Sequence, residues 1–296
     1  MLKVMGILAG VLVLLSLFNF LLGIRPITFQ TSSDPSRYGL SYEPVAFKTD
    51  DGLLIRGWFI PAGNTSHSNS SGIPKRPAIL IGHGYPFDKA NILPHVVFLH
   101  RDFHLLLIDF RYFGESDGAY TTVGLKETLD VAAAVAYLQQ REEVDPERIG
   151  AMGFSMSAAI ILLAQNPAIK AIVADSPYAS LTQVLRHQFF FLPGPLGWPI
   201  VKLTAFYAWL FLGVDLEEAA PAAAVRALST PVLLIHGEAD SQLPVTHAYQ
   251  IAANADPRFL ELWIVSRADH GQAHALAERE YEQKVLQFFA RHLLRS

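Results

Sequence analysis

The stretch Gly153-Phe154-Ser155-Met156-Ser157 decides how this chain is interpreted. It follows a short run over 148–152 that predicts a strand, and it precedes a run over 158–165 that predicts a helix. A serine on a tight turn between a strand and a helix has an exposed hydroxyl, and the helix N-terminus offers unpaired N–H groups to a developing oxyanion. The stretch therefore predicts Ser155 as a nucleophile, with an acid and a histidine further along. An ordinary N-cap serine is the alternative.

Asp240 is the predicted acid of such a site. It lies in a turn after the apolar run 232–236, which is typical of a buried strand. A carboxylate there can fix the tautomer of an imidazole and stabilise the imidazolium. A turn aspartate that bonds only its local backbone is the alternative. Asp175, at the end of another predicted strand, is the competing acid, and Glu238 is a weaker third candidate.

His270 is the predicted general base. It follows the last predicted strand, 259–265, and could take the proton from Ser155 and return it to the leaving group. His274, four residues later, is its near rival. Ligands of open parallel sheets bind outside the carboxyl ends of the strands, so side chains from distant parts of the chain can meet there.

Two backbone N–H groups complete the predicted site. Gly82-His83-Gly84 follows the short apolar strand 78–81, and Tyr85 comes directly after it. The N–H groups of Tyr85 and of Met156, the residue after the nucleophile, are expected to form an oxyanion hole.

Strand signals alternate with helix signals over most of the chain. Such alternation predicts an α/β fold with a mostly parallel sheet that helices cover on both faces. The expected strands are 45–49, 53–60, 78–81, 103–110, 148–153, 169–174, 232–236 and 259–265, and the expected helices are 93–100, 125–140, 158–165 and 278–294. The segment 180–228 carries no strand signal and an apolar helix pattern over 200–212. It predicts a helical cap inserted over the carboxyl end of the sheet.

The predicted cap is rich in aromatic residues, and these favour apolar pockets or interfaces. Phe189, Trp198 and Phe206 are the predicted substrate-binding residues among them. The cap therefore favours a substrate with an apolar acyl chain. Burial of most of these rings against the sheet is the alternative.

The composition excludes several classes of function. The 296 residues carry a formal net charge of −4, with a pI near 6.2 and no basic stripe, so nucleic acid is not an expected partner. The absence of cysteine excludes disulfides, thiolate metal sites and a cysteine nucleophile. The sequence holds no clustered metal signature and no nucleotide-binding loop, so neither a metal nor a cofactor is expected.

The N-terminal region is strongly apolar. Residues 4–24 hold no charged side chain and would span roughly 30 Å as a helix, about the thickness of a bilayer core. This predicts a single-pass membrane anchor over 1–25, with the side of the membrane open, followed by a tether over 26–41 and a hydrolase domain over 42–296. A signal peptide is the alternative, although no small-residue cleavage site follows the apolar run.

Taken together, these motifs resemble the α/β-hydrolase superfamily, and within it the Bem46-like and S33-type serine aminopeptidase branch. The matching motifs are His83-Gly84, Asp109-x-Arg111-x-x-Gly114-x-Ser116, Gly153-x-Ser155-x-Ser157, His236-Gly237-x-x-Asp240 and Asp269-His270-Gly271. The elbow ends in Ser157, where the family pattern has glycine. The resemblance covers about 42–296 and implies eight mostly parallel strands with a cap after the sixth.

The expected function is a serine hydrolase that cleaves carboxylic esters or thioesters through an acyl-enzyme intermediate. Two alternatives remain at this point. A peptidase or aminopeptidase could use the same triad, although the cap offers only Glu217 and Glu218 as acidic groups for a free amine. A non-catalytic membrane scaffold could retain the fold, although it would not need a complete triad.

Overall fold

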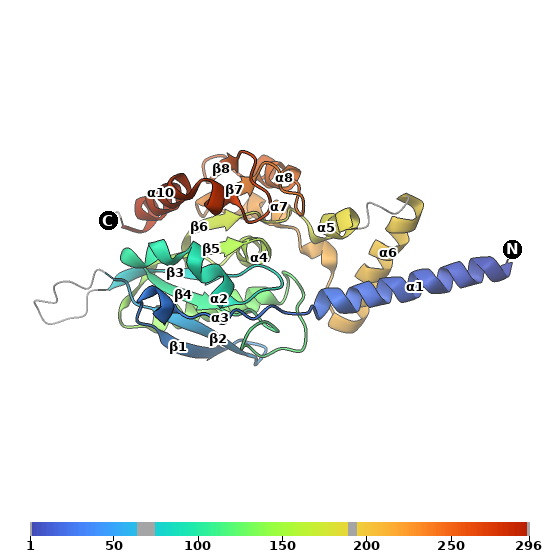
Figure 1. Ribbon diagram of the computed structural model, residues 1–296, viewed down its shortest axis with the longest axis horizontal. Coiled ribbons are helices and arrows are strands. Elements are labelled where there is room, and N and C mark those ends of the chain that lie inside the picture. Colours follow the sequence, from blue (N-terminus) through green and yellow to red (C-terminus); the bar gives the residue numbers. More distant parts are fainter. Residues whose placement is uncertain (1, 64–74, 189–193, 295–296) are drawn as a thin grey trace, which may run out of the picture.

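One twisted sheet organises the molecule, and helices pack on both of its faces (Figure 1). The computed structural model describes residues 2–63, 75–188 and 194–294. The sheet has eight strands in the order β1-β2-β4-β3-β5-β6-β7-β8. β1 pairs with β2, and β2 with β4, in antiparallel register, whereas the other neighbouring strands run parallel. The predicted fold, a mostly parallel sheet of eight strands, is confirmed.

The strands lie close to their predicted positions because their sequences are rich in apolar and β-branched residues. β3 and β4 at the centre are buried on both faces, as parallel strands covered by helices must be. The strands are β1 (Glu43–Lys48), β2 (Leu54–Ile60), β3 (Arg76–Gly82), β4 (His104–Ile108), β5 (Val144–Phe154), β6 (Ile169–Asp175), β7 (Val232–Gly237) and β8 (Leu260–Val265).

The helices divide the core into two layers. One apolar cluster lies between the sheet and α3, α4 and α8, and the other lies between the sheet and α2, α9 and α10. The α-helices are α1 (Leu2–Ile24), α2 (Lys89–Ile92), α3 (Glu127–Gln140), α4 (Met156–Ala164), α5 (Leu181–Gln188), α6 (Gly194–Tyr207), α7 (Pro221–Ala224), α8 (Thr246–Asn254), α9 (Ala273–Leu276) and α10 (Glu278–Phe289). The chain also forms two 3-10 turns, η2 (Leu93–His95) and η3 (Val97–Arg101), and a π-helical segment, η4 (Ala208–Leu212).

The helix expected over 93–100 is replaced by three shorter pieces. α2 begins earlier, because the Asp88 carboxylate accepts a hydrogen bond from the N–H of Asn91 and caps the first turn. Pro94 then lies in the 3-10 turn η2, and a second 3-10 turn, η3, follows. The signal for this start was the N-cap aspartate.

The N-terminal helix α1 corrects the sequence-based expectation. Within the described residues, no helix combines the length and the apolar character that crossing a bilayer requires, so the predicted anchor over 1–25 and the membrane location are wrong. The C-terminal half of α1 packs against its own chain. Ser16 and Phe20 are buried, and the Phe20 ring lies 5.8 Å from the Tyr207 ring of α6.

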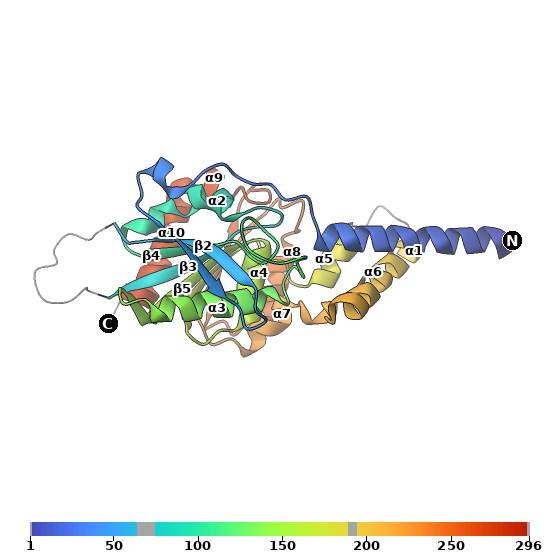
Figure 2. The same cartoon turned by 90° about the horizontal axis from the view of Figure 1, so that it is seen from below.

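The segment between β6 and β7 holds α5, α6, η4 and α7, and no strand occurs in its described part. α6 runs beside α1, and both extend away from the sheet in the two views of the molecule (Figures 1 and 2). α5 connects this pair to the end of β6. The first helix of the chain and the segment after β6 therefore form one structural layer next to the carboxyl ends of the strands.

Candidate active site

Ser155 occupies the sharp turn between β5 and α4. Its φ of 55° and ψ of −111° lie outside the ordinary regions for a residue with a side chain, which is the strain expected of a nucleophile turn. The backbone N–H of Ser155 donates to the carbonyl of Asp175 at 2.8 Å, and this bond fixes the turn to the neighbouring strand. The serine side chain is thereby held above the end of the sheet.

The close approach of α4 to the sheet explains the small residues around the turn. A Cβ on Gly153 would lie 2.5 Å from the backbone nitrogen of Ala158, so only glycine fits there. Ser157 is fully buried, and its hydroxyl bonds both the N–H and the carbonyl of Phe154. Gly82 on the adjacent strand makes room for this serine, since a Cβ on Gly82 would lie 2.5 Å from the Ser157 Cβ. The departure from glycine at position 157 is accommodated by Gly82.

A continuous hydrogen-bonded chain joins the three predicted catalytic side chains. His270 Nε2 lies 2.9 Å from Ser155 Oγ, and His270 Nδ1 lies 2.7 Å from Asp240 Oδ2. An ionised carboxylate can only accept, so the Nδ1–H of His270 donates to Asp240 and Nε2 is left to accept from the serine. The structure therefore brings Ser155, His270 and Asp240 together in the geometry that proton transfer requires.

The Asp240 carboxylate is held from several sides. Its Oδ1 accepts hydrogen bonds from the N–H groups of Gln242 and Leu243 at 3.0 and 2.7 Å. His236 Nε2 lies 3.5 Å from Oδ2 and donates to the Leu243 carbonyl. These bonds aim Oδ2 at His270.

The rival acid Asp175 has other partners. Its carboxylate accepts hydrogen bonds from the hydroxyls of Tyr281 and Ser176, at 2.8 and 2.9 Å. Burial raises the pKa of the Asp175 carboxyl, and these two hydrogen bonds offset part of the rise. In the described part of the chain, no hydrogen bond joins Asp175 to His270. The contacts of Asp175 are therefore those of a structural group.

The other histidines of the motifs have structural contacts. His83 is fully buried; its Nδ1 lies 2.9 Å from the Gly84 carbonyl, and its Nε2 accepts the N–H of Phe110. His274 contacts His95 and the Glu282 carboxylate. No cluster of three or more metal-ligating side chains occurs in residues 2–63, 75–188 and 194–294.

Tyr85 and Met156 lie beside the serine, where both help to line one cavity with Ser155 and His270. Met156 is the first residue of α4, so its N–H has no acceptor within the helix. The Tyr85 hydroxyl reaches the carbonyls of Leu22 and Gly23 at the end of α1, at 3.4 and 3.3 Å. Burial raises the pKa of Tyr85 to about 12, so this hydroxyl remains protonated and able to donate.

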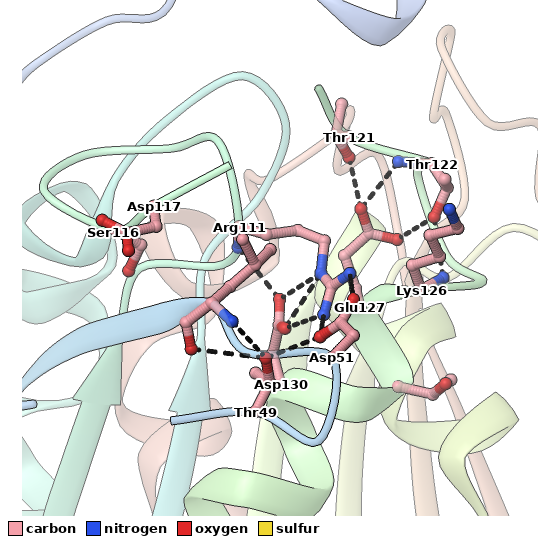
Figure 3. A network of polar contacts seen from close by, with 12 residues as sticks. Thr49, Asp51, Arg111, Ser116, Asp117, Thr121, Thr122, Lys126, Glu127 and Asp130 are labelled. Carbon is pink, nitrogen blue, oxygen red and sulfur yellow. Dashed lines mark hydrogen bonds and ion pairs between the residues drawn. The ribbon is translucent and has the colours of Figure 1, made fainter. Parts of the chain in front are cut away.

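A polar network holds the loop 121–124, which precedes α3 (Figure 3). The buried Glu127 carboxylate accepts four hydrogen bonds from the loop 121–124, two of them from the hydroxyls of Thr121 and Thr122. Beside it, the buried guanidinium of Arg111 binds the carboxylates of Asp130 and Asp51, each at 2.7 Å. The network fixes Thr122 and Val123, which line the cavity.

The cavity above Ser155 has a volume of about 490 Å³, within the usual range of small-molecule sites. Its walls come from α1, α5, α6 with η4, and the loop before α3. Most of the lining is apolar, including Phe20, Leu22, Leu181, Val184, Leu185 and Leu212. No aspartate or glutamate lines its described part.

The contribution of α1 to this cavity had no signal in the sequence. The helix end is attached to the site by several bonds besides those from Tyr85. The N–H of Thr121 donates to the Ile24 carbonyl, Arg25 Nε donates to the Ala119 carbonyl, and the Tyr112 hydroxyl donates to the Pro26 carbonyl, all at 2.9 Å. The first helix is thus a fixed wall of the site.

Two of the predicted substrate-binding aromatic residues, Trp198 and Phe206, are not among the residues that line the described part of the cavity. Trp198 and Phe206 on α6 are 61% and 48% exposed, and Phe189 lies outside the described residues. Thr204 and Ala208 are four residues apart and share the helical face that lines the cavity. Phe206 projects about 200° around the helix from Thr204 and therefore points away from the cavity. Trp198 and Phe206 therefore lie outside the described wall, which uses Thr204, Ala208 and Leu212 of the same segment.

Comparison with known proteins gives one matching family and several relatives of similar sequence. Residues 97–296 match the prolyl oligopeptidase family. The chain is 28% identical to YfhR of Escherichia coli (strain K12) over 80% of this chain and 78% of that protein. It is 31% identical to Rv2307c of Mycobacterium tuberculosis (strain ATCC 25618 / H37Rv) over 72% of this chain and 68% of that protein.

Among solved structures, the chain resembles the esterase Pf2001 of Pyrococcus furiosus, with a TM-score of 0.73 and 26% identity over 91% of this chain and 98% of that one. The predicted α/β-hydrolase fold is confirmed by this likeness and by the sheet topology. The narrower likeness to the Bem46-like and S33-type branch stays a prediction.

Proposed function

The chain belongs to the prolyl oligopeptidase family, and from this premise we propose that it cleaves carboxylic esters through a Ser155-His270-Asp240 triad. That it is a serine hydrolase of the α/β-hydrolase type follows from the family and the fold. One observation supports the triad above all others. An unbroken hydrogen-bonded chain from Ser155 Oγ through His270 to Asp240 Oδ2 lies at an apolar cavity.

In the proposed first step, Ser155 Oγ attacks the ester carbonyl while His270 Nε2 takes the hydroxyl proton. Asp240 stabilises the imidazolium that forms, because its carboxylate accepts the hydrogen bond from Nδ1. The imidazolium then gives its proton to the departing alcohol, which leaves an acyl group on Ser155. Water attacks this acyl-enzyme with the same histidine as base, and the acid is released.

The negative charge of each tetrahedral intermediate needs donors in fixed positions. We assign this role to the N–H groups of Met156 and Tyr85. Met156 stands at the N-terminus of α4, where the helix dipole also favours an anion. Tyr85 is held near the serine because its hydroxyl reaches the end of α1.

The lining of the cavity favours an ester with an apolar acyl chain. Burying such a chain against the leucine, valine and phenylalanine side chains of α1, α5 and η4 is favourable in proportion to the apolar area removed from water. The likeness to an esterase agrees with this substrate class. We propose a small-molecule ester as the substrate, and the chemistry requires no metal or cofactor.

Amide hydrolysis is the second candidate, because prolyl oligopeptidase is the name of the matching family. A site for a peptide with a free amino group requires a carboxylate near the serine. No acidic side chain lines the described cavity, and Glu217 instead bonds the Thr182 hydroxyl. The ester is therefore the better supported substrate.

The test compares p-nitrophenyl esters from acetate to palmitate with p-nitroanilides of the same acids. The full chain is required, because residues 19–24 of α1 help to line the cavity. We expect kcat/KM for the esters to rise from acetate to a chain of intermediate length, and to exceed that for the anilides. Ser155→Ala measured in parallel gives the background. Anilides cleaved faster than esters, or a flat chain-length profile, would contradict the proposal.

A further inference from the structure

The cavity wall formed by α6 contains a buried hydroxyl that has no hydrogen-bond partner in the described part of the chain. Thr204 is 4% exposed and lies on α6, where it lines the cavity. A threonine within a helix often bonds a carbonyl one turn earlier, but Thr204 Oγ1 has no hydrogen-bond partner in the described part of the chain. His104 Nε2 and His236 Nδ1 are the other buried side-chain atoms in that condition, and neither residue lines the cavity.

The hydroxyls of Ser16 and Tyr207, which meet between α1 and α6 outside the cavity lining, are satisfied. Ser16 of α1 donates to the Val13 carbonyl at 2.9 Å and lies 3.3 Å from the Tyr207 hydroxyl. Within the lining, the Thr122 hydroxyl donates to Glu127, and the Tyr178 hydroxyl donates to the Val123 carbonyl. These groups have no need of a ligand.

Other polar side chains of the lining have partners or are exposed to solvent, and His187 is among those that are not without a partner. Ser155 and His270 bond one another, and Gln188 donates to Asn19 at 3.5 Å. The side chain of Gln242 is exposed to solvent. Thr204 thus differs from them as a polar group that is buried, unpaired and surrounded by an apolar lining.

A buried hydroxyl without a partner costs free energy, so a site that retains one gains when a ligand supplies the missing partner. We propose that Thr204 is a specificity residue that hydrogen-bonds an oxygen substituent on the acyl chain of the substrate. This inference rests on the proposed function, since it assumes that an acyl chain bound to Ser155 occupies the cavity. The substrate class is then an ester of an acid with an apolar chain and an internal keto or hydroxyl group.

The test uses p-nitrophenyl decanoate and its keto isomers, with the carbonyl placed at successive carbons of the chain. For each protein we take the ratio of kcat/KM for a keto ester to that for the unsubstituted ester, so that overall changes of activity cancel. We expect the wild type to prefer one isomer by about three- to tenfold, the range that one neutral hydrogen bond supplies. Thr204→Val should bring this ratio close to that of the other isomers, and Thr204→Ser should retain the preference.

Thr182→Val is the matched control, because it is the same change in the neighbouring helix α5, at a residue outside the cavity lining. Its ratio should equal that of the wild type. The absence of any preferred keto isomer in the wild type, or a preference that survives in Thr204→Val, would overturn the inference. Loss of all Ser155-dependent ester hydrolysis would instead overturn the proposed function, so the two failures are distinguishable.

Discussion

Replacement of Ser155 by alanine is expected to lower kcat/KM for ester hydrolysis by at least about 10⁴-fold. The variant loses the oxygen that attacks the carbonyl, and His270 Nε2 loses the group whose proton it accepts at 2.9 Å. The backbone donors and the cavity remain, so a small rate above the uncatalysed reaction should persist. The measurement is the initial rate on the preferred p-nitrophenyl ester at saturating and limiting concentrations.

Ser157→Ala is the matched control for this substitution. It removes a hydroxyl from the same turn, but one that bonds only the Phe154 peptide. Its activity should stay within about tenfold of the wild type, because Ser157 Oγ bonds only backbone atoms of Phe154. The fold should tolerate the change, since a lost neutral hydrogen bond lowers stability by only about 1 kcal/mol. If Ser155→Ala kept the activity of Ser157→Ala, the nucleophile would lie elsewhere.

Asp240→Asn is expected to lower kcat by about 10⁴-fold with little change in the fold. The two oxygen positions of Asp240 have different partners. The oxygen that accepts from Gln242 and Leu243 can remain an acceptor in asparagine, which leaves the NH₂ group facing His270 Nδ1. His270 must then carry its proton on Nε2, and in that tautomer it cannot take the proton of Ser155.

Asp175→Asn distinguishes the two candidate acids. Asp175 bonds Tyr281 and Ser176 rather than His270, so this variant should lose far less activity than Asp240→Asn. Thermal unfolding of both variants checks that each is folded under the conditions of the assay. The reverse order of activities would transfer the role of the acid to Asp175.

The sequence predicted those parts of the fold and site that depend on local signals. Ser155, Asp240 and His270 each follow a strong apolar strand, and the carboxyl ends of neighbouring parallel strands meet at one edge. From β5 to β8 the strands are neighbours in chain order, as consecutive strands of such sheets tend to be, whereas β4 lies between β2 and β3. The triad could therefore be inferred before any distance was known.

The walls of the cavity could not be inferred in the same way. The charge-free run over 4–24 carries no periodic signal for the face that α1 buries, and its composition together with its length favoured a membrane anchor. Trp198 and Phe206 of α6 are exposed, and the face that α6 and η4 turn toward the cavity carries Thr204 and Ala208. Which face a helix presents is set by its packing partner, here α1, which is far away in the sequence.

The central claim, that Ser155 is an activated nucleophile, is tested most directly by covalent labelling with a serine-directed phosphonate ester. We predict that the full chain gains one phosphonyl group, that peptide mapping locates it on Ser155, and that the Ser155→Ala variant gains none. Asp240→Asn should be labelled much more slowly than the wild type, because its histidine cannot take the hydroxyl proton. Equal labelling of the wild type and the Ser155→Ala variant, or no labelling of the folded wild type, would contradict the account.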